Sequence, residues 1–215
     1  MDLNLDIPIL QSGSPSFKRA FDFIGAGVGL IICLPVSAII AILIKLESPG
    51  SVIFKQERIG KAGKCFVMYK FRTMCEDNQE IERDALSNDP ELLANFERFQ
   101  KIVDNPRLTP VGKFLRRTSL DEIPQFWNTL KGDMSLVGPR PFLTEQMDIY
   151  GDAYFDYIQL RPGMTGLWQV SGRNRLTFQE RVQLDVYYVR NQTLWFDLKI
   201  LFKTIGAVLA QDGAY

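Results

Sequence analysis

The sequence predicts an α-rich α+β fold, in which a re-entrant membrane helix hairpin precedes a cytosolic domain with a small β-hairpin and amphipathic interfacial helices. Three observations predict it: an apolar run over 21–44, a strand–turn–strand pattern directly after it, and helical periodicity in much of the remainder. The chain accordingly divides into a flexible leader at 1–17, the membrane segment at 18–47 and a cytosolic domain at 48–215.

The apolar run is long enough to cross a bilayer but contains a proline near its middle. As a straight helix its 24 residues would extend about 36 Å, against a hydrocarbon core of roughly 30 Å. Pro35 has no N–H for the carbonyl of Ile31, and its ring crowds the preceding turn, so we expect a break there. Ser37 is close enough in sequence to satisfy a freed carbonyl.

Basic residues flank the run on both sides. Lys18 and Arg19 precede it, and Lys45 and several further cations follow it. Because positive charge favours the cytoplasmic side, both ends are predicted to be cytoplasmic, and a segment that turns at Pro35 satisfies this. A kinked single-pass anchor is the alternative, whereas a signal peptide fits less well because no cleavage site follows.

The composition excludes several classes of protein. With 46% hydrophobic residues and a formal net charge of +0, the 215 residues suit one globular unit beside the membrane segment and give no case for nucleic acid. The three cysteines lack the spacing of a zinc site or disulfide framework. The absence of histidine removes Ser-His-Asp and Cys-His catalysis and every His-ligated metal site.

The elements after the membrane segment follow from turn signals and periodicity. Residues 52–54 and 65–69, separated by a Gly-Lys-Ala-Gly turn, predict a β-hairpin. One or two amphipathic helices are expected within 78–101, and further helices at 119–130, 178–189 and 194–209, with glycine-rich loops at 132–141 and 161–172. The 194–209 helix suits either the membrane interface or the protein core equally well.

Residues 116–124 combine guanidinium groups with adjacent carboxylates. Arg116 suits a phosphate, and Asp121 and Glu122 suit Mg²⁺ or attack on phosphorus. Taken alone, a helix cap is the more ordinary explanation, because Ser119 and Glu122 fit a capping box and Pro124 suits a first helical turn.

Other cations and glycines have two interpretations. Lys70 and Arg72 at the end of the hairpin, and Arg140 in a Gly-Pro-Arg-Pro loop, could clamp a diphosphate or form ordinary solvated surface. The Gly-x-Gly-x-Gly stretch at 25–29 superficially suggests a nucleotide loop, but within a membrane segment close helix packing explains it better.

Taken together, the sequence motifs of this chain resemble those of the bacterial sugar transferases, which are monotopic polyprenol-phosphate phosphoglycosyl transferases. The resemblance rests on ordered motifs at 18–22, 50–60, 69–74, 119–124, 131–141, 161–166 and 169–173, and covers nearly the whole chain from Lys18 onward. The sequence departs from the family pattern at Leu34, directly before Pro35, where some small members have serine. The break at the proline is still expected, but the angle of the helix hairpin does not follow from the resemblance.

The resemblance implies Mg²⁺-dependent transfer of a sugar-1-phosphate from a UDP-sugar to undecaprenyl phosphate, with release of UMP. By position, Asp121 matches the nucleophile and Glu122 its partner, both at the metal. The implied substrate and phosphate set is Lys70, Arg72, Arg116, Arg140, Arg173 and Asp197. The expected location is the cytoplasmic face of a bacterial inner membrane, among membrane lipids and without nucleic acid; a homodimer is left open.

Two rival functions remain at this stage. One is a non-catalytic, membrane-anchored scaffold or regulator of envelope assembly, against which intact Asp121, Glu122 and Arg116 argue. The other is a bitopic protein with an external domain, in which Asn191-Gln192-Thr193 would be an accessible glycosylation sequon.

Overall fold

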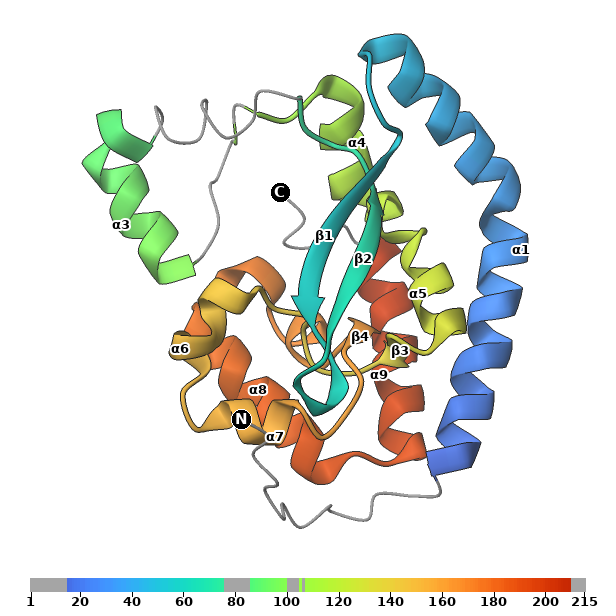
Figure 1. Cartoon of the computed structure of the whole chain (residues 1–215), viewed down its shortest axis with the longest axis vertical. Helices are drawn as coiled ribbons and strands as arrows, with labels where there is room; N and C mark the ends of the chain where they lie inside the picture. The colour runs from blue at the N-terminus through green and yellow to red at the C-terminus, as the bar shows by residue number, and fades with distance from the viewer. Residues whose placement is uncertain (1–14, 76–85, 100–104, 106, 210–215) are drawn as a thin grey trace.

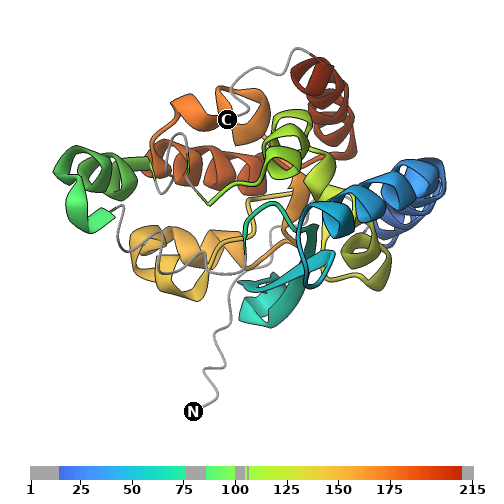
Figure 2. The same cartoon turned by 90° about the horizontal axis from the view of Figure 1, so that it is seen from above.

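The structure is a computed structural model that describes residues 15–75, 86–99, 105 and 107–209. A long helix lies along one side of the molecule, and α3 lies at the opposite end (Figure 1, Figure 2). The helices are α1 (Pro15–Glu47), α3 (Pro90–Phe99), α4 (Pro110–Thr118), α5 (Gln125–Lys131), α6 (Met147–Tyr150), α7 (Ala153–Tyr157), α8 (Phe178–Asn191) and α9 (Leu194–Leu209). The strands are β1 (Ile53–Ile59), β2 (Cys65–Phe71), β3 (Ser135–Val137) and β4 (Gly163–Thr165).

The two halves of the predicted membrane hairpin are one continuous helix, so the prediction of a break at Pro35 was wrong. Figure 1 shows α1 as a single curved helix, and Pro35 lies inside it. Ser37 donates a hydrogen bond to the carbonyl of Cys33 at 2.8 Å, rather than to that of Ile31. The helix also begins at Pro15, so the last residues of the predicted leader are helical; residues 1–14 lie outside the described part.

Contacts at both ends of α1 explain why the helix continues through the proline. At its start, the two terminal nitrogens of Arg19 donate to the carbonyls of Thr129 and Leu130, at the end of α5. At its end, Glu47 accepts a hydrogen bond from the backbone N–H of Val111 in α4 at 2.9 Å. Tertiary contacts at both ends therefore outweigh the local cost of one missing hydrogen bond.

The glycines of α1 allow close packing, as the sequence indicated. A Cβ at Gly25 would lie 2.6 Å from the side chain of Leu136, and one at Gly29 would lie 2.6 Å from the ring of Phe126. A Cβ at Gly27 would meet its nearest neighbour only at 3.9 Å. Two of the three glycines therefore provide space that the domain fills.

Gly29→Ala is expected to destabilise the protein, whereas Gly27→Ala is not. The clash with the Phe126 ring costs about 1–3 kcal/mol, against a gain in helix propensity of about 1 kcal/mol that both variants share. Thermal unfolding of the two variants in the same detergent measures the difference. Equal stability would contradict the packing described here.

The predicted β-hairpin is confirmed and is longer than predicted. Strands β1 and β2 pair antiparallel, with Ile53 opposite Phe71 and Ile59 opposite Cys65. A second, parallel pair was missed: Ser135 of β3 lies opposite Gly163 of β4. The two glycine-rich loops thus meet, and a Cβ on Gly163 would lie 2.1 Å from the backbone nitrogen of Gly138.

Three apolar clusters hold the domain together. One joins α1 to β3, α8 and α9; one lies under α6 and α7; and one joins the second half of α1 to β2 and α4. Helix α8 begins at a capping box in which Thr177 accepts from the backbone N–H of Glu180, and it confirms the helix predicted over 178–189. Helix α9 has the predicted bounds, and α3 accounts for part of the region predicted over 78–101, of which 78–85, 100 and 101 lie outside the described residues.

Helix α9 has one buried and one exposed apolar side. Asp197 and Ile200 are buried, whereas Trp195, Phe202 and Ile205 are exposed. The helix α1 has an apolar exposed face of the same kind, which includes Ile31 and Leu46. These faces are large apolar surfaces that the described residues leave uncovered.

Candidate functional site

The candidate site is built on a short turn between α4 and α5. Helix α4 is capped at its start by Thr109, whose hydroxyl accepts a hydrogen bond from the N–H of Gly112. The residue that follows its last turn is Ser119, which has a left-handed φ of 57°. A 3₁₀ turn, Leu120–Glu122, follows and carries the two carboxylates. Ser119 makes no side-chain cap, so the capping-box explanation was wrong and Glu122 is not used to cap a helix.

Lys70 of β2 joins both carboxylates of this turn. Its ammonium lies 2.7 Å from Oε1 of Glu122 and 3.6 Å from Oδ2 of Asp121. The side chain of Asp121 is 9% exposed, and that of Glu122 is 31% exposed. The sequence therefore placed these three groups in one site correctly, although 51 positions separate Lys70 from Asp121 along the chain.

The same geometry shifts the pKa values of Asp121 and Glu122 in opposite directions. Burial raises the pKa of Asp121 above its usual value, with the charge of Lys70 as the main opposing effect. Burial acts on Glu122 in the same sense, but the ion pair and hydrogen bond with Lys70 prevail, so the pKa of Glu122 is lowered. A buried carboxylate beside a lysine suits attack on phosphorus.

Two of the predicted arginines lie beside the turn. Burial lowers the pKa of the Arg116 guanidinium, with Asp121 as the main opposing influence, and its Nε donates to the hydroxyl of Thr73 at 3.1 Å. Arg173 donates to the hydroxyl of Ser119 at 3.1 Å and helps to lower the pKa of Glu122. Both therefore contribute positive charge near the carboxylates.

A cavity of about 50 Å³ opens next to Lys70 and Glu122. The predicted Arg140 lines it, together with Arg58 and Trp168, to which the sequence assigned no role. The guanidinium of Arg140 lies 4.9 Å from the centre of the Trp168 ring, in a cation–π contact. The signal that could have indicated Arg58 is its place in the Gln-x-Arg-x-Gly string after the apolar run.

Arg72 does not line this cavity, and its assignment to the phosphate set stays a prediction. Its guanidinium donates to the carbonyls of Ser48 and Pro49, in the loop that follows α1. A hydrogen bond to the hydroxyl of Ser48 adds to this contact. Arg72 therefore ties the hairpin to the end of α1.

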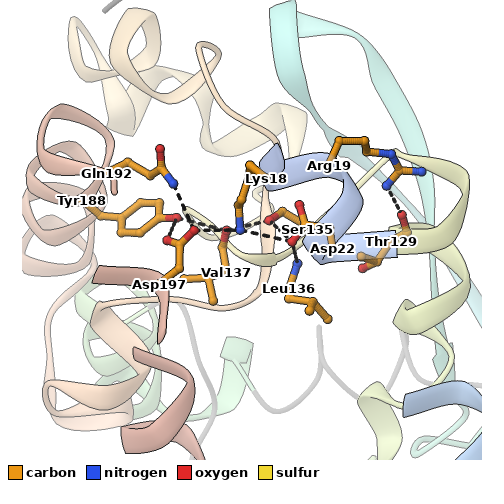
Figure 3. Close-up of polar contacts among 10 residues, drawn as sticks. All are labelled: Lys18, Arg19, Asp22, Thr129, Ser135, Leu136, Val137, Tyr188, Gln192 and Asp197. Atoms are coloured by element: carbon orange, nitrogen blue, oxygen red, sulfur yellow. Dashed lines mark hydrogen bonds and ion pairs between the residues drawn. The ribbon is translucent and has the colours of Figure 1, made fainter. Parts of the chain in front are cut away.

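Asp197 is fully buried and belongs to a different cluster, shown in Figure 3, and its assignment to the substrate set stays a prediction. Its oxygens accept from Tyr188 at 2.7 Å and from Gln192 at 3.0 Å, and they pair with Lys18 at 2.9 Å. Lys18 also pairs with buried Asp22 at 3.1 Å. The cluster fixes the start of α1 to α8 and α9.

The donor set of the turn fits a magnesium ion. No group of three or more His, Cys, Asp or Glu side chains that could hold a metal occurs in the part of the chain that the structure describes. Mg²⁺, however, commonly binds one or two carboxylates and completes its shell with water and substrate phosphates. Asp121 and Glu122 provide such a pair, with Lys70 between them in the present arrangement.

The structure thus places a long apolar helix in the same domain as a buried carboxylate–lysine–arginine cluster. One helix, Ser16–Glu47, is long and apolar enough to cross a membrane, and only 11% of its most apolar stretch is buried. The chain belongs to the bacterial sugar transferase family, whose model matches residues 13–211.

Curated relatives agree with this family. An undecaprenyl-phosphate galactose phosphotransferase of Salmonella typhimurium is 45% identical over 215 residues, which cover 100% of this chain and 45% of that protein. The exopolysaccharide production protein ExoY of Rhizobium meliloti is 42% identical over 92% of this chain and 88% of its own length. A UDP-glucose:undecaprenyl-phosphate glucose-1-phosphate transferase of Escherichia coli is 39% identical over 92% of this chain and 41% of that protein.

The chain thus spans less than half the length of the Salmonella and Escherichia relatives and most of the Rhizobium one. The matched region includes the whole described site, because the family match runs continuously from residue 13 to residue 211.

Proposed function

We propose that this chain transfers a sugar-1-phosphate from a UDP-sugar to undecaprenyl phosphate, at the cytoplasmic face of a bacterial plasma membrane. The observation that carries the proposal is the buried Asp121 beside Lys70 and Arg116, in a chain of the bacterial sugar transferase family. The names of the Salmonella and Escherichia relatives support these two substrates. The product would begin a polysaccharide chain, as the name of the Rhizobium relative suggests.

Two displacements at one phosphorus account for the reaction. A carboxylate oxygen of Asp121 attacks the β-phosphorus of the UDP-sugar, and UMP leaves with the electron pair of the broken P–O bond. An oxygen of undecaprenyl phosphate then attacks the same phosphorus, and the carboxylate of Asp121 is regenerated. Neither step needs a proton donor, which suits a site without histidine.

The cations around the turn supply the electrostatic stabilisation. Lys70 and Arg116 lie beside Asp121, so in the proposed reaction their charges would offset the charge that develops on the phosphoryl oxygens, and burial would strengthen this effect. A bound Mg²⁺, held by Asp121 and Glu122, would neutralise further phosphate charge. Glu122 keeps its negative charge because Lys70 pairs with it.

The packing of α1 supports an orientation with both ends of the helix in the cytoplasm. Its first turns contact α5 and α9, and its last turn contacts α4, so one folded domain touches the helix at both ends. A perpendicular crossing would carry one of these contact regions through the bilayer. The exposed apolar face of α1 would instead lie in one leaflet, where the phosphate of the lipid and a cytosolic nucleotide sugar meet.

Accessibility labelling tests this orientation. Ser16 and Ser51 are exposed residues near the two ends of the helix, and single cysteines can be placed there in a cysteine-free background. Both should react with a membrane-impermeant maleimide in inverted vesicles and neither in intact spheroplasts. Labelling of the two positions from opposite sides would contradict the proposed orientation.

The activity is tested by adding UDP-sugars to the full chain in lipid nanodiscs. UMP release that depends on undecaprenyl phosphate and gives a lipid-linked diphosphate sugar is expected with UDP-galactose or UDP-glucose. Failure of every UDP-sugar would contradict the proposed activity and favour a non-catalytic scaffold.

Lys70→Gln is expected to reduce kcat/KM by about 10²–10³-fold and to move the acid limb of its pH profile to higher pH. Attack requires ionised Asp121, and removing the nearby positive charge raises the pKa of that carboxyl further. The measurement is kcat/KM against pH for both proteins. Lys131→Gln is the control, because Lys131 pairs with Asp133 at the surface; an unshifted limb in Lys70→Gln would contradict this role.

A further inference from the structure

The cavity beside the carboxylates is surrounded by more buried positive charge than the protein neutralises. Arg58 is 9% exposed and lines it together with Lys70 and Arg140. Arg181 lies directly behind, with its guanidinium 5.3 Å from the centre of the Trp168 ring, so Trp168 contacts both Arg140 and Arg181. No ion pair joins Arg58, Arg140 or Arg181 to a carboxylate within the described ranges.

Three buried N–H donors around this cavity have no hydrogen-bond partner. They are Nε of Arg58, Nε of Arg140 and the indole Nε1 of Trp168, which is 7% exposed. Leaving a buried donor unpaired is costly, so three together indicate a ligand that accepts hydrogen bonds. The terminal nitrogens of Arg58 are already used by the carbonyl of Pro141 and the side chain of Gln56, which fixes the orientation of its guanidinium.

One carboxylate, that of Asp185, lies close to Arg140 and Arg181 but forms no ion pair with their guanidinium groups among the described residues. Asp185 is buried and accepts from the backbone N–H of Arg140 and the hydroxyl of Tyr150, both at 3.2 Å, while its other oxygen has no partner. Burial raises the pKa of Asp185 to about 7, and burial together with the charge of Arg140 lowers the pKa of Arg58 to about 10. The charge of Arg140 contributes to the Arg58 shift, as neighbouring positive charges should. The Asp185 shift has burial as its cause and is opposed by the charges of Arg140 and Arg181.

We infer that this cavity is a phosphate subsite, lined by Arg58, Arg140 and Trp168, which holds first the phosphate of the departing UMP and then that of undecaprenyl phosphate. A volume of about 50 Å³ has room for a few water molecules, which is the scale of a phosphate group rather than of a nucleotide sugar. The inference rests on the proposed function and names two phosphate-binding residues, Arg58 and Trp168, beyond those already assigned.

The geometry of displacement explains why one subsite serves both phosphates. In each step the entering and leaving oxygens lie on opposite sides of phosphorus. UMP therefore leaves from the side opposite Asp121, and the lipid phosphate must attack from that same side to displace Asp121. The second phosphate enters the place that the first has left, so UMP should compete with undecaprenyl phosphate.

The test measures both phosphates on full-length variants in nanodiscs. Trp168→Phe keeps an aromatic ring but removes the N–H, and Arg58→Lys keeps the charge but removes Nε. Each lost hydrogen bond to a charged group should weaken UMP binding, measured by calorimetry, by about tenfold or more. Arg190→Gln is the control, because Arg190 is exposed and pairs only with Asp156 among the described residues.

The measurements with UMP and with undecaprenyl phosphate distinguish the two sources of the phosphate. We expect the Kd of UMP and the KM of undecaprenyl phosphate to rise together, whereas binding of uridine, which lacks a phosphate, stays unchanged. A rise in only one of them would overturn the shared subsite. Unchanged values for both variants, in an enzyme that still releases UMP, would overturn the subsite and leave the proposed function intact; absence of UMP release in the unmodified chain would contradict the function itself.

Discussion

Asp121→Asn is expected to lower turnover by at least about 10⁴-fold while the fold is retained. Asparagine has nearly the same shape but cannot form the covalent intermediate. Because burial raises the pKa of Asp121, the folded state binds its proton more tightly than the unfolded state. The stability of the unmodified protein therefore falls as the pH rises through the pKa that Asp121 has in the folded state. Asp121→Asn has no titrating group at this position, so at neutral pH it should be at least as stable as the unmodified protein. UMP release and thermal unfolding measure the two effects.

Glu122→Gln provides the comparison for this variant. Glu122 is more exposed than Asp121 and pairs closely with Lys70, so its loss should reduce the rate without preventing formation of the intermediate. If Asp121→Asn retained turnover close to that of the unmodified chain, another nucleophile would have to be sought.

Lys18→Met is expected to produce the largest loss of stability, roughly 3 kcal/mol, because it leaves two buried carboxylates without their shared cation. Lys18 lies 2.9 Å from Asp197 and 3.1 Å from Asp22. Figure 3 shows these residues together. For a domain of this size the change should lower the melting temperature by roughly 6–12 °C. Lys55→Met, at an exposed position in β1, is the control.

A double-mutant cycle distinguishes this ion pair from simple packing. Asp197→Asn removes the other partner, so the double variant Lys18→Met/Asp197→Asn should be more stable than the sum of the single losses predicts. Strict additivity would show that the two residues stabilise the protein independently. Activity should fall only as far as folding does, because neither residue lies in the cavity.

Local sequence patterns predicted the elements that local physics determines. The hairpin of β1 and β2 followed from alternating residues around a Gly-Lys-Ala-Gly turn, and α8 and α9 followed from periodicity. The continuity of α1 was not predictable in this way. Pro35 lowers local helix stability, but Arg19 and Glu47 attach the two ends of the helix to segments that lie far away in the sequence.

The site was predictable where its residues are neighbours in sequence and only partly where they are not. Asp121 and Glu122 are adjacent, and Lys70 could be linked to them through the family resemblance. Arg72 was assigned to the site as a cation at the end of the hairpin, and Asp197 was assigned through the family resemblance. Their partners, the carbonyl of Ser48 and the ammonium of Lys18, depend on tertiary packing that periodicity does not reveal.

The unpaired donors of the cavity were partly visible in the sequence. Arg140 was expected from its Gly-Pro-Arg-Pro loop and Arg58 lies in the Gln-x-Arg-x-Gly string, whereas no pattern distinguished Trp168. Their meeting depends on tertiary packing, because Arg58 comes from β1 and the two glycine-rich loops pack closely, with a Cβ on Gly163 only 2.1 Å from the backbone nitrogen of Gly138.

Intact-mass spectrometry of the full chain, incubated with a UDP-sugar but no lipid acceptor, tests the covalent role of Asp121 most directly. We predict a mass gain of one sugar phosphate, mapped to the peptide that contains Asp121, which disappears when undecaprenyl phosphate is added. Asp121→Asn should gain no such mass. A full adduct on Asp121→Asn, or its location on another residue, would contradict the role of Asp121 as the nucleophile.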